Sequence, residues 1–131
     1  ADICNEVANE KMQTPLTKKD STQDESQFSH NSVTDFKNNI TGVLNAYKCQ
    51  YGGKSGHSLS ELVASKNASL DSKIQAQINT AIASFGGITT TYEKAIYTQT
   101  NQIKTVQAAI NTLKATIEGD LDNFIEVNVK D

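Results

Sequence analysis

The densest group of residues able to do chemistry is one short polar run that holds hydroxyls, an imidazole, amides and carboxylates: Asp24-Glu25-Ser26-Gln27-Phe28-Ser29-His30-Asn31-Ser32. A helix is expected to begin at Asn31 or Ser32. A helix N-terminus offers free amide groups and the positive end of its dipole, so an anion or a substrate carboxylate could dock there. Alternatively, Ser32 and Asp35 only cap the helix, because they have the spacing of a capping box. Capping accounts for those two residues but not for Phe28, Ser29 and Asn31.

The two histidines are weaker candidates. His30 could act as a general base or a metal ligand, although a lone loop histidine is more often a surface residue. His57 precedes Ser58 in a glycine-rich loop, where a role in the turn is favoured. Glu61 lies four residues after His57, but that spacing crosses an expected helix cap and so weakens a metal interpretation.

Cys4 and Cys49 are the only cysteines. A disulfide between them would tie the first helix to the end of the helix that starts at Ser32, and would indicate an oxidising compartment. They could equally be two small buried apolar residues. Sequence separation does not decide between the two, and we favour the unbridged form slightly.

Composition excludes several classes of protein. The 131 residues include 12 basic residues, all of them lysine, and 15 acidic residues, which gives a net charge of −3. A mildly acidic chain without arginine is a poor nucleic-acid binder. No apolar run approaches the roughly 20 residues of a membrane helix, and two histidines with two cysteines leave little room for an all-protein zinc site. The chain opens without an initiator methionine on what reads as the middle of a helix, so upstream sequence is expected.

The elements that must position the polar run are helices, because apolar residues recur at steps of three and four. The predicted helices cover the first residues to about Met12, then about 32–48, about 58–65, from about 68 to 97 with a break at Gly86-Gly87, and a final helix with an apolar seam from Ile103 to Phe124. Residues 13–30 show no period and are predicted to form a long polar loop, which is often functional. No segment shows the strict alternation of apolar and polar residues that is typical of a β-strand. We therefore predict an all-α, mostly antiparallel bundle of three to four main helices plus one short helix, with residues 1–131 as a single unit.

Three segments of the chain resemble the C-terminal half of the imelysin family. ADICNEVANEKMQTPL is similar to the helix that precedes the family's long loop. ESQFSHNSVTDFKNNITGVLNAY is similar to the stretch E-S-x-F-S-x-N-[ST]-x-x-D-[FY]-x-N-N-[IM]-x-[GS]-[IV]. GHSLSELVASKNASLDSKIQAQINTAI is similar to a short helix and the long helix after it.

The resemblance implies an all-helical protein of two facing halves, periplasmic or at the bacterial cell surface, often a lipoprotein and often linked to iron acquisition. It implies a site between the halves, to which this half contributes Phe28, Ser29, Asn31, Ser32 and Asp35. The family is classed with metallopeptidases because its first half carries a G-x-H-x-x-E motif, which this chain lacks. His30 is not carried over, since the family usually has other residues there.

The resemblance and the residues together leave three hypotheses. The first is a binding module whose partners are the missing N-terminal half and iron, haem or an envelope protein, with no nucleic acid, no transmembrane segment and no catalytic or metal-ligating residue of its own. The second is a fragment of a metallopeptidase. The cofactor of the full-length protein stays open, with iron or another divalent metal as the candidates. The third is a purely structural bundle. We adopt the first, and whether the full-length protein is an enzyme stays open.

Overall fold

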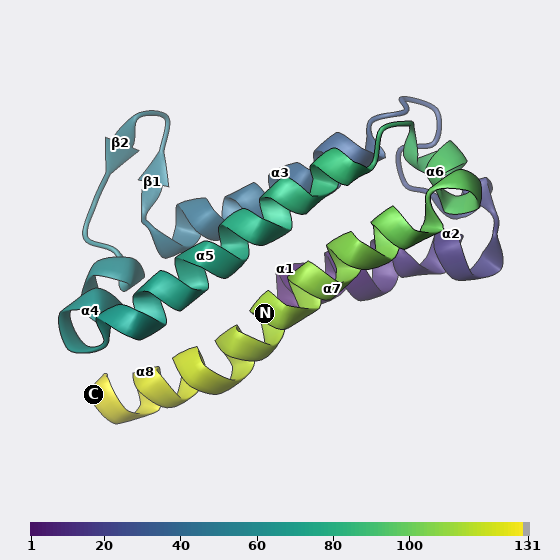
Figure 1. Ribbon diagram of the computed structural model, residues 1–131. Helices are drawn as coiled ribbons and strands as arrows, with labels where there is room; N and C mark the ends of the chain where they lie inside the picture. Colours follow the sequence, from purple (N-terminus) through teal and green to yellow (C-terminus); the bar gives the residue numbers. More distant parts are fainter. Residues whose placement is uncertain (130–131) are drawn as a thin grey trace.

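A computed structural model describes residues 1–129 of the chain (Figure 1). Within them the first half contains α1 (Asp2–Asn5), a π-helical turn η1 (Glu6–Lys11), α2 (Gln13–Lys18), a 3₁₀ turn η2 (Ser21–Gln23) and α3 (Ser32–Tyr47). A small hairpin of β1 (Gln50–Tyr51) and β2 (Lys54–Ser55) follows. The second half contains α4 (Leu59–Lys66), α5 (Ala68–Ser84), the 3₁₀ turn η3 (Phe85–Gly87), α6 (Tyr92–Thr98), α7 (Thr100–Thr116), the π-helical turn η4 (Ile117–Leu121) and α8 (Asp122–Asn128).

The helices form the antiparallel bundle that the sequence predicts. In Figure 1, α3 and α5 run side by side in opposite directions, and α7 runs back beneath α5. The N-terminal segment α1–η1 packs against α7, while α2 and α6 close one end of the bundle. The prediction of an all-α fold is confirmed. None of the helices within residues 1–129 is both long and apolar enough to cross a membrane.

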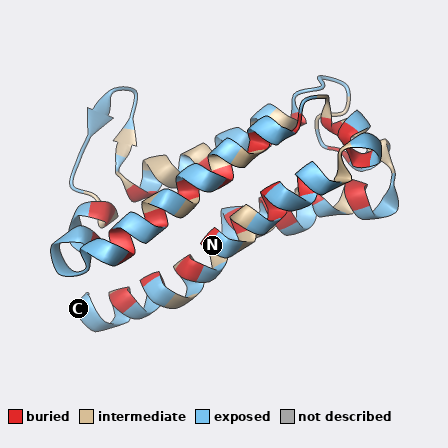
Figure 2. Ribbon diagram, in the orientation of Figure 1, coloured by how far each residue is buried: buried red, intermediate tan, exposed pale blue. Residues whose placement is uncertain are grey.

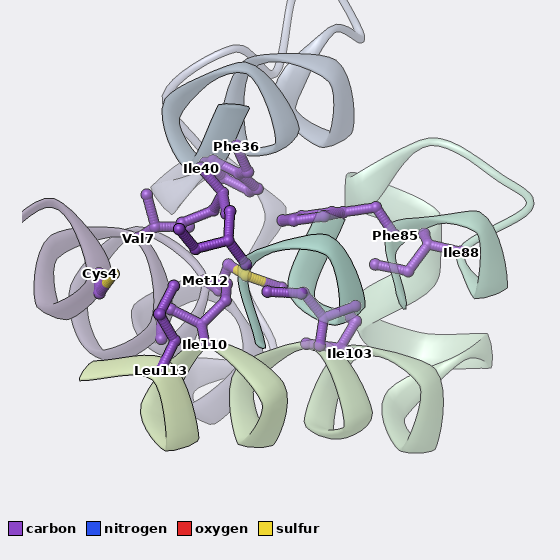
Figure 3. Close-up of a cluster of buried hydrophobic side chains, with 14 of the residues drawn as sticks. Cys4, Val7, Met12, Phe36, Ile40, Phe85, Ile88, Ile103, Ile110 and Leu113 are labelled. Carbon is purple, nitrogen blue, oxygen red and sulfur yellow. The ribbon is translucent and has the colours of Figure 1, made fainter. Parts of the chain in front are cut away.

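Buried residues recur along α3, α5 and α7, as the red segments of the ribbon in Figure 2 show. Figure 3 shows the centre of this core, where side chains from four parts of the chain meet: Cys4, Val7, Met12, Phe36, Ile40, Phe85, Ile88, Ile103, Ile110 and Leu113. The rings of Phe36 and Tyr92 pack edge to face with centroids 5.2 Å apart, an arrangement that aromatic pairs prefer. This packing fixes the end of α3 nearest the polar run against the start of α6.

Local signals set several helix ends as expected. Ser58 and Glu61 form both hydrogen bonds of a capping box at the start of α4, and the Asn67 side chain accepts from the Leu70 amide at the start of α5. The predicted break at Gly86-Gly87 is confirmed, because α5 gives way there to η3.

The N-terminal segment is docked by polar contacts as well as apolar ones. The Gln107 side chain donates to the Ala8 carbonyl at 2.7 Å, inside the wide turn of η1. Asn9 and Asn111 exchange two amide hydrogen bonds at 2.9 and 3.1 Å. The buried Tyr92 hydroxyl donates to the carbonyl of Met12 at 2.5 Å. Buried backbone acceptors of this segment therefore find their donors on α6 and α7.

The structure corrects two expectations about secondary structure. Residues 13–30 are not one loop, since 13–18 form α2 and 21–23 form η2. Pro15 lies in the first turn of α2, where a missing N–H costs no helical hydrogen bond. The YGGKSG stretch turns as predicted, but it also contributes to two short strands. These strands are too short to show an alternation of apolar and polar residues in the sequence. They are joined through Gly52 and Gly53, whose φ angles are 57° and 77°. Positive φ at both turn residues is the geometry of a tight hairpin.

The cap of α3 also differs from the prediction. The N-cap residue is Asn31, and no side chain caps the helix there. Ser32 points into the protein instead of back along the chain. Both cysteines are free, with Cys4 buried in the core and Cys49 exposed at the hairpin.

Candidate functional site

The polar run forms a tight loop, residues 24–31, between η2 and α3 at the end of the bundle where α2 and α6 lie (Figure 1). Inside it the amides of Ser29 and His30 both donate to the Ser26 carbonyl, at 3.1 and 2.9 Å. The loop is therefore a defined turn, and several of its polar side chains bond to residues of α3, η1 and α6.

Asp24 and Ser32 close the base of this loop. The buried Ser32 hydroxyl donates to Asp24 Oδ2 at 2.5 Å, and Asp24 itself is only 3% exposed. The other oxygen, Oδ1, is buried and accepts no hydrogen bond from a described residue. Burial raises the pKa of Asp24, the Ser32 hydrogen bond lowers it, and the charges of Glu93 and Glu25 raise it further, with a net upward shift.

Asp35, in the first turn of α3, holds the middle and the end of the loop. Its carboxylate accepts from the Ser26 hydroxyl at 2.8 Å and from the Asn31 amide at 2.8 Å. Ser32 and Asp35 therefore do not form the capping box that their spacing suggested. Asp35 instead accepts hydrogen bonds from side chains of the loop, and Ser32 donates one to Asp24.

His30 connects the loop to α6. Its Nδ1 lies 2.9 Å from Glu93 Oε1, and its backbone has a φ of 56°, a left-handed conformation that histidine, asparagine and aspartate adopt more often than most residues. Burial acts to raise the pKa of Glu93, but hydrogen bonds from His30, from the Glu93 amide and from Thr91 outweigh it, so the pKa is lowered.

The predicted site residues thus fall into two groups. Phe28, Ser29 and Asn31 are exposed, and Phe28 is the extreme case at 90%. Ser32 and Asp35 lie beneath them and are committed to Asp24, Ser26 and Asn31. Any direct contact with a ligand therefore falls to the exposed group, while Ser32 and Asp35 shape the loop that presents it.

The charge around the loop disfavours the anion that a free helix N-terminus would suggest. Four carboxyl groups gather here, those of Asp24, Glu25, Asp35 and Glu93. The neighbouring cation is Lys11, which bridges Glu25 at 3.3 Å and Glu6 at 3.0 Å. A cationic or neutral polar ligand suits this surface better than an anionic one.

The sequence did not indicate that Glu93 belongs to the candidate site. Asp24 was part of the polar run but was not predicted as a site residue. Glu93 stands 63 residues from His30, and nothing in a sequence pairs residues at that separation. Asp24 was within reach of sequence reasoning, because it lies only eight positions before Ser32, a separation that this loop closes. Among residues 1–129, no three His, Cys, Asp or Glu side chains come together in a way that could hold a metal ion.

Asp71 is a second buried carboxylate, and unlike Asp24 it accepts hydrogen bonds on both of its oxygens. Asp71 accepts from Tyr47 at 2.9 Å, from Ser60 at 2.6 Å and from Gln75 at 2.7 Å. Burial acts to raise the pKa of Asp71, but these three donors outweigh it and lower the pKa. Asp71 is therefore structural, whereas Asp24 has an oxygen to spare.

Comparison with known proteins gives two solved structures and one family model. The imelysin family model matches residues 1–118. An imelysin peptidase from Bacteroides ovatus is similar over 95% of this chain at 28% identity and a TM-score of 0.81. A protein described as an iron-regulated protein A precursor, from Parabacteroides distasonis, is similar over 88% of this chain at 28% identity and a TM-score of 0.61. The chain spans 37% and 38% of the lengths of those two proteins. The comparison with curated proteins gave no match.

Proposed function

Because the chain belongs to the imelysin family, we propose that it is a ligand-binding half of a bacterial cell-envelope protein that takes part in iron or haem-related uptake. Its ligand lies on the loop of residues 24–31, at an interface with a second helical half of the same protein. This half binds and does not catalyse.

One observation carries the proposal. The loop presents Phe28, Ser29 and Asn31 to the outside while the polar atoms beneath hold it in one shape. The Phe28 ring is 90% exposed, so a partner that covered it would bury a large aromatic surface. A rigid turn with an exposed aromatic and two small polar side chains has the composition of a recognition surface.

The choice of iron over other ligands rests on two supports. The carboxylates around the loop make a surface that attracts cations. One structural neighbour is described as an iron-regulated protein. The same charge disfavours haem, whose propionate groups are anionic, so we place ferric iron before haem as the ligand.

The partners follow from the shape of the site. The exposed loop would face the second half, which supplies the side chains that coordinate the iron. A periplasmic or surface position, through a lipid anchor outside this chain, is part of the proposal, since iron must be captured before it crosses the inner membrane.

The test is ligand-dependent stabilisation of the full-length protein. Ferric citrate at ten times its dissociation constant should stabilise the protein by about 1.4 kcal/mol, measured as a rise in the thermal unfolding midpoint. A variant with F28A, S29A and N31A together should lose most of that rise, because all three side chains are exposed and their removal leaves the core intact. Haemin in a parallel titration should give a smaller rise.

The matched control is Y51A. Tyr51 is an exposed aromatic residue on the hairpin, 87% exposed, so its removal tests whether loss of any surface aromatic has the same effect. The proposal fails if ferric citrate gives no rise, or if the triple variant and Y51A respond alike. In that case the chain is a structural bundle.

A metallopeptidase is the second candidate, favoured by the structural neighbour described as an imelysin peptidase. The described residues supply no set of three metal ligands, so the zinc or other divalent metal would be held by a G-x-H-x-x-E motif in the other half. Peptide hydrolysis by the full-length protein that stops with a chelator would support this candidate. Hydrolysis that is absent before any chelator is added would exclude it.

A further inference from the structure

A groove lies between α3 and the β1–β2 hairpin, which projects from the end of that helix in Figure 1. Its volume is about 920 Å³, within the range of about 300–1,000 Å³ that is typical of pockets for small molecules. The second half of α3 forms the floor of this hairpin groove, and the hairpin forms its wall. The groove therefore has the size of a ligand site.

The floor of the hairpin groove is flat and largely apolar. Asn38, Gly42 and Ala46 are exposed and recur at steps of four, so they lie in one row on the solvent side of α3. Gly42 and Ala46 have no side-chain atom beyond Cβ, and nothing lies within 4 Å of the position that a Cβ on Gly42 would take. A flat ring placed on such a surface makes many van der Waals contacts at once.

Local hydrogen bonds hold the wall at its distance from the floor. The Gln50 side chain donates to the Asn45 side chain at 3.3 Å, which joins β1 to α3. The Gly56 amide donates to the Cys49 carbonyl at 3.0 Å, which closes the base of the hairpin. The groove is therefore formed before any ligand arrives, and a ligand that fits it pays little to shape it.

The charge of the lining is positive. Lys54 lines the groove from β2, and no described residue of the lining carries a carboxylate. Lys54 forms no ion pair with any residue in the range 1–129. The amide groups of Asn38 and Gln50 line the same groove and can donate hydrogen bonds to oxygen atoms. This lining is complementary to a ligand that combines an apolar body with one negative charge.

We propose that the hairpin groove binds a small aryl carboxylate, with its flat ring on Gly42 and Ala46 and its carboxylate at Lys54. Tyr51 also lines the groove, but its side chain is 87% exposed and adds little contact area. The site is at the opposite end of α3 from the loop of residues 24–31. It goes beyond the proposed function and does not depend on it.

Protection of Cys49 from alkylation tests the proposal on the 131-residue chain. Cys49 is exposed and lines the groove, whereas Cys4 is buried, so the native chain offers one fast thiol to the neutral reagent iodoacetamide. The probe is 2-naphthoate, whose dissociation constant is read from the concentration dependence of the alkylation rate. At ten times that constant about one site in eleven stays empty, so the rate should fall about tenfold. Glutathione alkylated under the same conditions corrects for any direct effect of the probe.

A neutral probe isolates the contribution of the charge. 2-Naphthamide has the same ring and no charge, so it should need a concentration about two- to fivefold higher for equal protection, as expected for one partly exposed ion pair. K54Q should remove this difference between the two probes while some protection by both persists. If K54Q keeps the preference for naphthoate, Lys54 is not the partner of the carboxylate and the proposal is wrong.

Two glycine variants test the floor. G42L places a side chain in the open space of the groove, and leucine is a good helix former, so α3 should persist while naphthoate no longer changes the alkylation rate. G119L is the matched control, because Gly119 is also helical and also has nothing within 4 Å of an added Cβ, but lies in η4. It should be protected like the wild type. The proposal is overturned if naphthoate does not protect wild-type Cys49, if G42L and G119L are protected alike, or if decanoate protects better than naphthoate.

Discussion

Removal of the Ser32 hydroxyl by S32A should destabilise the chain through Asp24, and not through the cap of α3. In the structure this hydroxyl is the side-chain donor to a carboxylate that is 3% exposed and whose second oxygen has no partner among the described residues. The substitution leaves both oxygens without a side-chain donor. An ionised buried group that loses its donor costs about 1–3 kcal/mol, which is the expected loss in the free energy of unfolding at pH 7.

The pH dependence of that loss separates this mechanism from a packing effect. The pKa of Asp24 is already raised in the folded protein. A carboxyl group of this kind contributes stability below its ordinary range, and that stability is lost as the pH rises through the raised pKa. S32A removes a hydrogen bond that lowers the pKa, so it moves the transition to still higher pH. The difference between wild type and S32A should therefore be largest at neutral pH and shrink as Asp24 takes up a proton.

Urea unfolding at pH 7 and at a pH below the ordinary carboxyl range measures both values. D24N is the companion variant, because asparagine is neutral and its carbonyl can still accept from Ser32. D24N should cost less than S32A at pH 7, and S32A should cost little when introduced into D24N. The reasoning is refuted if S32A costs under about 0.5 kcal/mol at pH 7, or if its cost is the same at both pH values and in the D24N background.

Three further outcomes are expected. D71N should cost about 2–3 kcal/mol at pH 7, because three donors lose a charged acceptor. Since the pKa of Asp71 is lowered, the cost in urea unfolding should shrink as the pH falls below the ordinary carboxyl range, and a constant cost would contradict this. A thiol reagent should modify Cys49 alone in the native chain and reach Cys4 only on unfolding; two fast thiols would be inconsistent. G119A should stabilise by about 0.5–1 kcal/mol, because nothing lies within 4 Å of the added Cβ, and a lower urea midpoint would be the contrary result.

The helices were predictable wherever one face of the element meets the core. Phe36 and Ile40 in α3, and Ile103 and Ile110 in α7, are fully or nearly fully buried and recur at helical spacing. Burial of such a stripe dominates the choice of secondary structure. The capping box at Ser58 was also readable, because both of its hydrogen bonds are local.

The candidate site was predictable as a region but not as a set of contacts. Ser32 and Asp35 have the spacing of a cap, and only the folded loop shows that Asp24 and Ser26 take their hydrogen bonds instead. Competition between a local and a non-local partner depends on where the rest of the chain lies, which the spacing does not record. The Glu93 partner of His30 comes from another helix for the same reason.

The contacts of the N-terminal segment set the order in which the chain can assemble during synthesis. Gln107 and Ala8 are 99 residues apart in sequence, and Asn9 and Asn111 are 102 apart. At ribosomal rates of about 5–20 residues per second, the partners on α7 emerge several seconds after the segment that needs them. Until then the apolar side of η1 has no partner on α7. A chaperone that shields the first turns of this chain would therefore raise its folding yield, and moving these residues to the C-terminus by circular permutation would remove the delay.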